Sequence, residues 1–86
     1  MKLIVYGTNA CPDCVEAIQK LDERKADYVY LEFSNNMQNL KRFLKLRDTE
    51  AIFDAVKEQG KVGIPCFKLE DGTLTLDLEE VLDKIG

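Results

Sequence analysis

The chain contains no histidine, and only three of its 86 residues are cysteine. Without histidine, the usual ligands of a closed four-ligand zinc site are missing within one chain, because Cys66 is the only sulfur left beyond Cys11 and Cys14. Three cysteines are also too few, and odd in number, for the disulfide framework of a secreted domain. We therefore expect no bound metal, and a Cys-x-x-Cys pair that is redox-active.

The chain also lacks a basic surplus and any long apolar run. Its 12 lysine and arginine residues against 16 acidic ones leave a formal charge of −4, which offers no field for nucleic acid or an anionic membrane. The apolar opening, residues 1–6, is too short for a membrane span or a signal sequence. A content of 45% hydrophobic residues without a linker predicts one domain over residues 1–86, which we expect to be monomeric and cytoplasmic.

The residue patterns predict an α/β protein with the element order β-α-β-α-α-β-β-α. Strands are expected at Leu3–Tyr6, Tyr28–Phe33, Pro65–Leu69 and Thr73–Leu76. The first two should be parallel, with a right-handed crossover, and the last two antiparallel across a turn at Glu70–Gly72. A four-stranded mixed sheet flanked by helices follows.

The helical segments show apolar residues at helical spacing. The first helix should run from Pro12 to near Lys25, and in the middle of the chain Asp48-Thr49 should cap a new segment, so that two short helices or one kinked helix fit equally well. Asp77 should cap the last helix. The expected buried faces are Val15, Ile18 and Leu21, then Met37, Leu40 and Leu44, then Ile52, Phe53 and Val56, and finally Leu78, Val81, Leu82 and Ile85.

The most informative motif is Cys11-Pro12-Asp13-Cys14, at the junction between the first strand and the first helix. With Cys11 as N-cap, Pro12 occupies N1, where its missing N–H costs nothing, and Cys14 occupies N3. Backbone N–H groups of the first turn should point at the Cys11 sulfur, and the positive end of the helix favours its thiolate, although Asp13 opposes a second negative charge nearby. Cys11 is thus the expected nucleophile, and Cys14 the thiol that resolves the mixed disulfide.

This motif, together with Ile64-Pro65 opening the third strand, resembles the glutaredoxins and their relatives of thioredoxin fold over nearly the whole chain. The resemblance implies a thioredoxin-like fold and a thiol-disulfide oxidoreductase that reduces protein or mixed disulfides, with roles in electron transport and cell redox homeostasis. It implies that Pro65 is cis and faces the cysteines, and that the backbone of Ile64 pairs with the thiol substrate. The implied site comprises catalytic Cys11 and Cys14 and substrate-binding Pro12, Ile64, Pro65 and Asp77.

The positions that hold glutathione in the family differ in this chain. Thr8 stands where a lysine is common, Asp13 replaces the usual tyrosine, and the hook before the last helix is apolar. Asp77 could still hold an ammonium group. Glutathione or a flavoprotein disulfide reductase could donate electrons, and no tightly bound cofactor is expected. The alternative function is an iron-sulfur-binding or redox-sensing interaction module without turnover.

Three further features allow two interpretations each. Cys66 is a small buried hydrophobe or a third redox-active thiol. Pro65 is an ordinary strand-edge proline or the substrate-facing cis proline that the resemblance implies. The basic cluster comprises Lys41, Arg42, Lys45 and Arg47, and it is a solvated helix face or a docking patch for an acidic protein or an anionic tripeptide.

Overall fold

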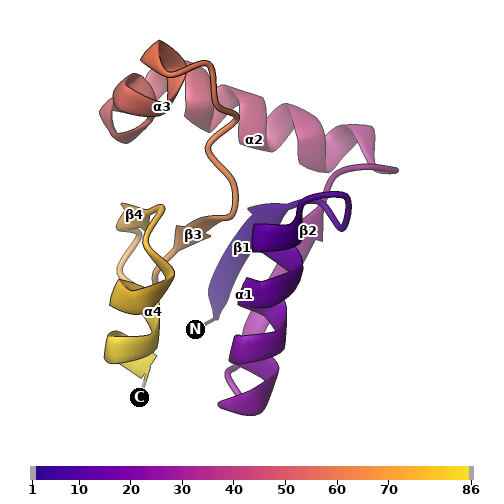
Figure 1. Cartoon of the computed structure of the whole chain (residues 1–86), viewed down its shortest axis with the longest axis vertical. Helices are drawn as coiled ribbons and strands as arrows, with labels where there is room; N and C mark the ends of the chain where they lie inside the picture. Colours follow the sequence, from indigo (N-terminus) through magenta and orange to yellow (C-terminus); the bar gives the residue numbers. More distant parts are fainter. Residues whose placement is uncertain (1, 86) are drawn as a thin grey trace.

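The structure is a computed structural model that describes residues 2–85, and it contains one four-stranded sheet with helices on both faces (Figure 1). The sheet order is β2-β1-β3-β4. The elements in chain order are β1 (Leu3–Gly7), α1 (Pro12–Glu23), β2 (Tyr28–Glu32), α2 (Met37–Thr49), the 3₁₀ helix η1 (Ala51–Phe53), α3 (Asp54–Glu58), β3 (Cys66–Lys68), β4 (Leu74–Thr75) and α4 (Leu78–Ile85). The order expected from the sequence is confirmed, with η1 as an addition.

Strand β1 lies inside the sheet and joins its parallel and antiparallel halves. It pairs with β2 in parallel, from Leu3 opposite Tyr28, and with β3 antiparallel, so that Tyr6 lies opposite Cys66. Strands β3 and β4 are antiparallel, as expected. The mixed sheet, with its parallel β1-α1-β2 unit, is therefore the one that the sequence predicts.

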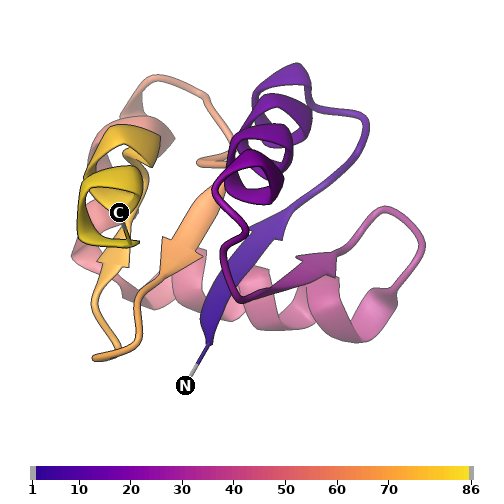
Figure 2. The same ribbon diagram turned by 90° about the horizontal axis from the view of Figure 1, so that it is seen from below.

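Two apolar clusters fill the two faces of the sheet. Helices α1 and α4 cover one face and α2 the other (Figure 2). The first cluster comprises Leu3, Val5, Ala17, Leu21, Phe67, Leu69, Val81 and Leu82, and the second comprises Tyr6, Phe43, Phe53 and Cys66. Burial on both faces explains why β1 is apolar without alternation. The three layers form a thioredoxin-like fold.

Four residues assigned to buried helix faces lie on the surface instead. Val15, Met37, Leu44 and Ile85 are exposed, Met37 to 64%. In α1 the buried residues are Cys14, Ala17 and Leu21, and in α2 only Phe43 is buried, where it stacks with Phe33 and meets Phe53 edge-on. The helix faces are set by where the sheet and the aromatic cluster lie, which helical periodicity does not specify.

The expected cap at Asp48-Thr49 is wrong. Helix α2 continues through Thr49, whose hydroxyl donates to the Lys45 carbonyl, and the extended conformation of Glu50 ends it. The middle of the chain is thus one long helix followed by two short ones. The cap at Asp77 is confirmed, because its carboxylate accepts the Glu79 N–H at 3.0 Å. Within residues 2–85, no helix has the length and apolarity needed to cross a membrane.

Candidate functional site

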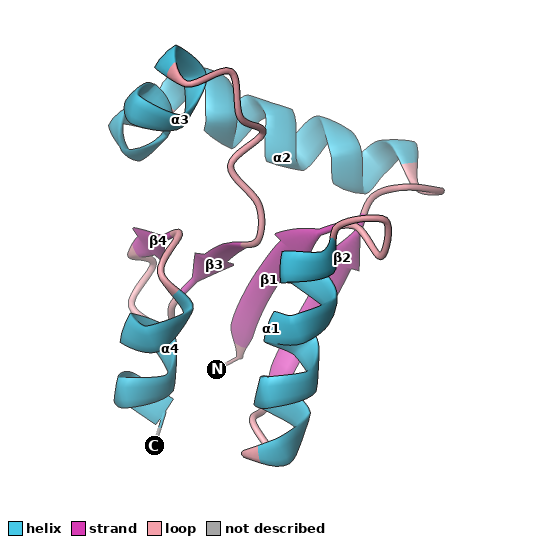
Figure 3. Cartoon of the chain, viewed as in Figure 1, coloured by secondary structure: helices cyan, strands magenta, loops and turns pink. Residues whose placement is uncertain are grey.

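The two loops that carry the expected site meet at one end of the sheet (Figure 3). One loop leads from β1 into α1, and the other leads from α3 into β3. Because β1 and β3 are antiparallel, with Tyr6 opposite Cys66, the end of β1 lies beside the start of β3. The fold therefore brings Cys11 close to Ile64 and Pro65, which are more than fifty residues away in sequence.

Helix α1 begins as the motif predicts. Cys11 is the N-cap in extended conformation and Pro12 opens the helix. The N–H groups of Cys14 and Val15 both donate to the Cys11 carbonyl at 3.1 Å. The sequence also predicted that first-turn N–H groups donate to the Cys11 sulfur. This prediction is wrong: the Cys11 side chain makes no capping hydrogen bond.

The two thiols occupy different environments. Cys11 is partly exposed, whereas Cys14 is completely buried, and neither is in a disulfide. Burial raises the pKa of Cys14 to about 12; a hydrogen bond from the Thr8 backbone amide lowers it, and the adjacent Cys11 and Asp13 raise it further. Cys11 is thus the accessible thiol of the pair, and the buried thiol of Cys14 lies next to it.

An open groove of about 500 Å³ lies beside Cys11. Its wall is mostly apolar and comprises Val56, Val62, Ile64, Pro65 and Leu76, with Asp13 and Lys61 as its charged members. The Ile64-Pro65 peptide bond is cis, as the resemblance implied. Neither backbone polar group of Ile64 has a hydrogen-bond partner among residues 2–85, so both are available to a bound chain.

Gly63 shapes the approach to the cis bond. Its φ is +93°, and a Cβ there would lie 2.8 Å from Cδ1 of Phe53. Only glycine satisfies both the positive φ and the close contact. The sequence marked Gly63 as a break in the helical pattern, but its contact with Phe53 is visible only in the fold.

The loop before Cys11 is held by residues that the sequence did not single out. The Asn9 N–H donates to Glu32 Oε2 at 2.9 Å, and the Tyr30 hydroxyl donates to Asn9 Oδ1 at 3.2 Å. Hydrogen bonds from the Ser34 hydroxyl and the Asn9 amide lower the pKa of Glu32. Burial raises the pKa of Tyr30 to about 12, with the nearby Cys14 and Glu32 charges adding to the effect. Strand β2 therefore fixes the loop that precedes Cys11.

Two expected substrate residues lie beside the groove rather than in its wall. Pro12 is exposed at the start of α1, and the Asp77 carboxylate caps α4 while Leu76 lines the groove. The contact of Asp77 with an ammonium group therefore stays a prediction. A further groove, next to Asp27 and Lys84 at the other end of the sheet, contains no thiol.

Cys66 lies in the apolar cluster with Tyr6, Phe43 and Phe53 and is completely buried. Burial raises its pKa to about 12, which fits the interpretation as a small buried hydrophobe. Among residues 2–85, no three histidine, cysteine or acidic side chains are grouped so that they could hold a metal ion.

A thioredoxin-like fold with a partly exposed and a buried cysteine near a cis proline defines the class of thiol-disulfide redox proteins. Residues 3–67 match the sequence model of the glutaredoxin family, and the chain belongs to that family. It is 38% identical over 80 residues to an uncharacterized protein of Haemophilus influenzae, with 93% of each chain covered. No solved structure gives a significant match.

Proposed function

We propose that this protein is a dithiol-disulfide oxidoreductase that reduces protein or mixed disulfides with Cys11 and Cys14. The observation that carries the proposal is the pairing of an accessible Cys11, open to an apolar groove, with a fully buried Cys14 behind it. A thiol that only stabilised the core would not need to open onto a groove. We also propose that the protein is monomeric and is located in the cytoplasm.

The reaction proceeds in two exchange steps. The Cys11 thiolate attacks one sulfur of the substrate disulfide, forms a mixed disulfide, and releases the other substrate sulfur as a thiolate that takes up a proton. Cys14 then loses its proton and attacks Cys11 Sγ, which releases the second substrate thiol and leaves a Cys11–Cys14 disulfide. Two electrons pass from the protein to the substrate, and glutathione or a flavoprotein disulfide reductase returns them.

The electrostatics of Cys14 support this order of events. Burial holds the pKa of Cys14 high, and a negatively charged Cys11 beside it raises that pKa further. Once Cys11 is bound in a mixed disulfide, its charge is gone, while the hydrogen bond from the Thr8 amide to Cys14 remains. Cys14 therefore becomes easier to deprotonate only after Cys11 has reacted.

The groove supports a polypeptide as the substrate. The Ile64 backbone groups are unpartnered, so they can pair with an extended segment that flanks the substrate disulfide. Val62 and Leu76, which line the same groove, supply apolar contacts. Pro12, at the exposed start of α1, and Asp77 complete the proposed substrate surface.

The test is reduction of insulin and of a glutathione mixed disulfide. Each assay is run with glutathione plus its reductase and with thioredoxin reductase. We expect turnover with at least one donor, none with Cys11→Ser, and accumulation of a mixed disulfide with Cys14→Ser, seen as a mass increase under non-reducing conditions. Absence of turnover with every donor would overturn the proposed enzymatic activity. A visible absorption band in anaerobically purified protein would instead indicate the iron-sulfur alternative.

A further inference from the structure

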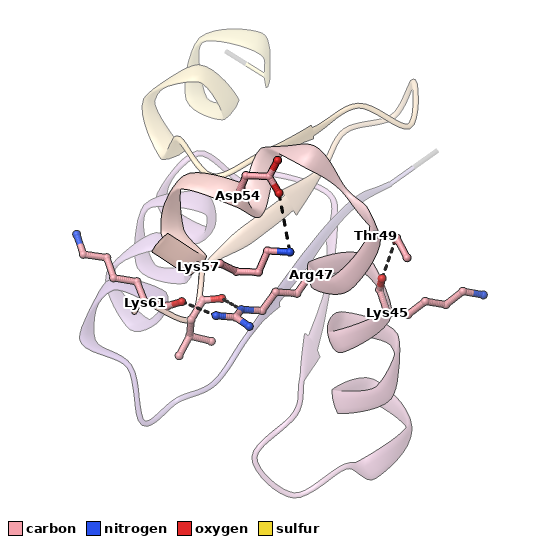
Figure 4. A network of polar contacts seen from close by, with 7 residues as sticks. Lys45, Arg47, Thr49, Asp54, Lys57 and Lys61 are labelled. Atoms are coloured by element: carbon pink, nitrogen blue, oxygen red, sulfur yellow. Dashed lines mark hydrogen bonds and ion pairs between the residues drawn. The ribbon is translucent and has the colours of Figure 1, made fainter. Parts of the chain in front are cut away.

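One member of the basic cluster, Arg47, makes contacts unlike those of its neighbours. It lies in the last turn of α2, where its Nε donates to the Val62 carbonyl at 2.8 Å and its Nη2 donates to the Lys61 carbonyl at 2.7 Å (Figure 4). One planar guanidinium therefore binds two consecutive carbonyls, fourteen and fifteen residues away in the chain.

These carbonyls belong to the loop that forms one wall of the Cys11 groove. Gly63 and the cis Ile64-Pro65 bond follow directly after them. The loop has no sheet partner before β3 begins at Cys66. The Val62 side chain is 51% exposed, so burial of that side chain does little to anchor the loop.

Other contacts also hold this segment, because Ile64 packs against the apolar cluster that contains Phe43 and Phe53, and Pro65 is buried. The Lys61 N–H donates to the Val56 carbonyl at 2.8 Å, and Gly63 packs against Phe53. Both contacts join the loop to η1 and α3. The bonds from Arg47 join the backbone at Lys61 and Val62 to α2, and charge-assisted hydrogen bonds of this kind are among the stronger ones in proteins.

The neighbouring cations offer no substitute. The side chains of Lys41, Arg42 and Lys45 are exposed and form no ion pair or hydrogen bond within residues 2–85. Asp54, close by in Figure 4, is paired with Lys57 at 3.9 Å. Arg47 is thus the member of the cluster that reaches the groove loop.

We infer that Arg47 is a positioning residue, which holds the backbone at Lys61 and Val62 so that Ile64 and Pro65 stay opposite Cys11. The inference rests on the proposed disulfide exchange for its functional consequence. Arg47 acts through the loop and does not touch the substrate. Lysine cannot replace it, because a single ammonium lacks the planar fork that binds two adjacent carbonyls at once.

The kinetic test compares Arg47→Lys and Arg47→Gln with Lys45→Gln, which removes an exposed charge two residues away. Because the loop binds the polypeptide and Cys11 performs the chemistry, we expect both Arg47 variants to raise KM for a protein disulfide about fivefold, with kcat changed less than about twofold. Alkylation of Cys11 by iodoacetamide should stay at the parent rate, since this small reagent reaches the thiol without binding to the loop. Lys45→Gln should match the parent in every measurement.

Parent-like KM in Arg47→Lys would overturn the inference, and so would a loss of kcat together with slower alkylation of Cys11. Amide hydrogen exchange provides a test that needs no turnover. We expect faster exchange in Arg47→Lys at Lys61, whose N–H is bonded to the Val56 carbonyl, and unchanged exchange in β1. Unchanged exchange in the loop would overturn the inference even if the parent is active. Faster exchange in a protein without turnover would still support Arg47 as the residue that positions the loop. It would refute only the proposed oxidoreductase activity.

Discussion

Gly7 lies directly against the buried thiol of Cys14: a Cβ on Gly7 would be 2.7 Å from Cys14 Sγ and 3.3 Å from Cys14 Cβ. No real Cβ tolerates the shorter distance, so the last residue of β1 must be glycine for Cys14 to occupy its site. The reason is space, because Gly7 is not among the glycines with positive φ. The end of β1 therefore determines where the buried thiol of Cys14 can lie.

Gly7→Ala should displace Cys14 and slow the second exchange step. We expect a loss of about 1–3 kcal/mol in the free energy of unfolding, because the added methyl group overpacks the site. The mixed disulfide should also accumulate during turnover. Urea unfolding and non-reducing mass spectrometry measure the two effects. The control is Gly72→Ala, which strains a φ of +90° with no atom nearby and should therefore also lose stability; equal accumulation of the mixed disulfide in the two variants would contradict the role of Gly7.

Cys66 should be unreactive in the folded protein. It is completely buried, and burial raises its pKa to about 12, so almost no thiolate exists at pH 8. Iodoacetamide should therefore label Cys11 in the native protein, and Cys66 only in denaturant, as peptide mapping can show. Cys66→Ala should retain turnover and lose about 1 kcal/mol of stability. Native labelling of Cys66, or loss of turnover in Cys66→Ala, would support a third redox-active thiol.

The reduced protein should lose stability at alkaline pH. Folding raises the pKa values of the Cys14 and Cys66 thiols from 9.0 to about 12. Well below pH 9 both thiols are neutral in either state and their contribution is intact; between about pH 9 and 12 the unfolded chain releases these protons first. Each thiol then lowers the free energy of unfolding by at most about 1.4 kcal/mol per pH unit. Urea unfolding at several pH values measures the slope, and a slope for Cys66→Ala as steep as that of the parent would contradict this account.

Substitution of Asp77 can separate capping from ligand binding. Asp77→Ala removes the bond to the Glu79 N–H and should cost about 1 kcal/mol of stability. Asp77→Asn keeps an equally good cap and should have parent-like stability. If Asp77 also holds an ammonium group, Asp77→Asn should raise KM for a glutathione mixed disulfide severalfold. An unchanged KM in a stable Asp77→Asn variant would restrict Asp77 to its structural role.

Asp13 should discourage anionic substrates. It lies in the wall of the Cys11 groove and of a neighbouring groove that also contains Glu16 and Glu79. Asp13→Asn should therefore speed the reaction with glutathione disulfide about two- to fivefold at low salt, and less at 0.5 M salt, because surface charges are screened. The rate with insulin should change less. A salt-independent acceleration would point to a cause other than charge.

The starts of α1 and α4 could be predicted from the sequence because local interactions determine them. The N-cap at Cys11, the proline at N1 and the cap at Asp77 each depend on residues within one helical turn. The positions of the strands along the chain follow from apolar runs and turn residues in the same way. The cis Ile64-Pro65 bond came only from the resemblance to the glutaredoxins, and the structure confirms it.

The contacts that build the site join residues far apart in the chain, and no local pattern encodes them. Glu32 holds Asn9 from 23 residues away, and Arg47 reaches the carbonyls of Lys61 and Val62. The choice of helix face also depends on such packing, which is why Val15 lies on the surface while Cys14 is buried. The sequence thus specified the Cys11–Cys14 pair and its helix, because short-range hydrogen bonding sets them, whereas long-range packing against β1 and α2 decided which cysteine is buried and how the groove beside Cys11 is formed.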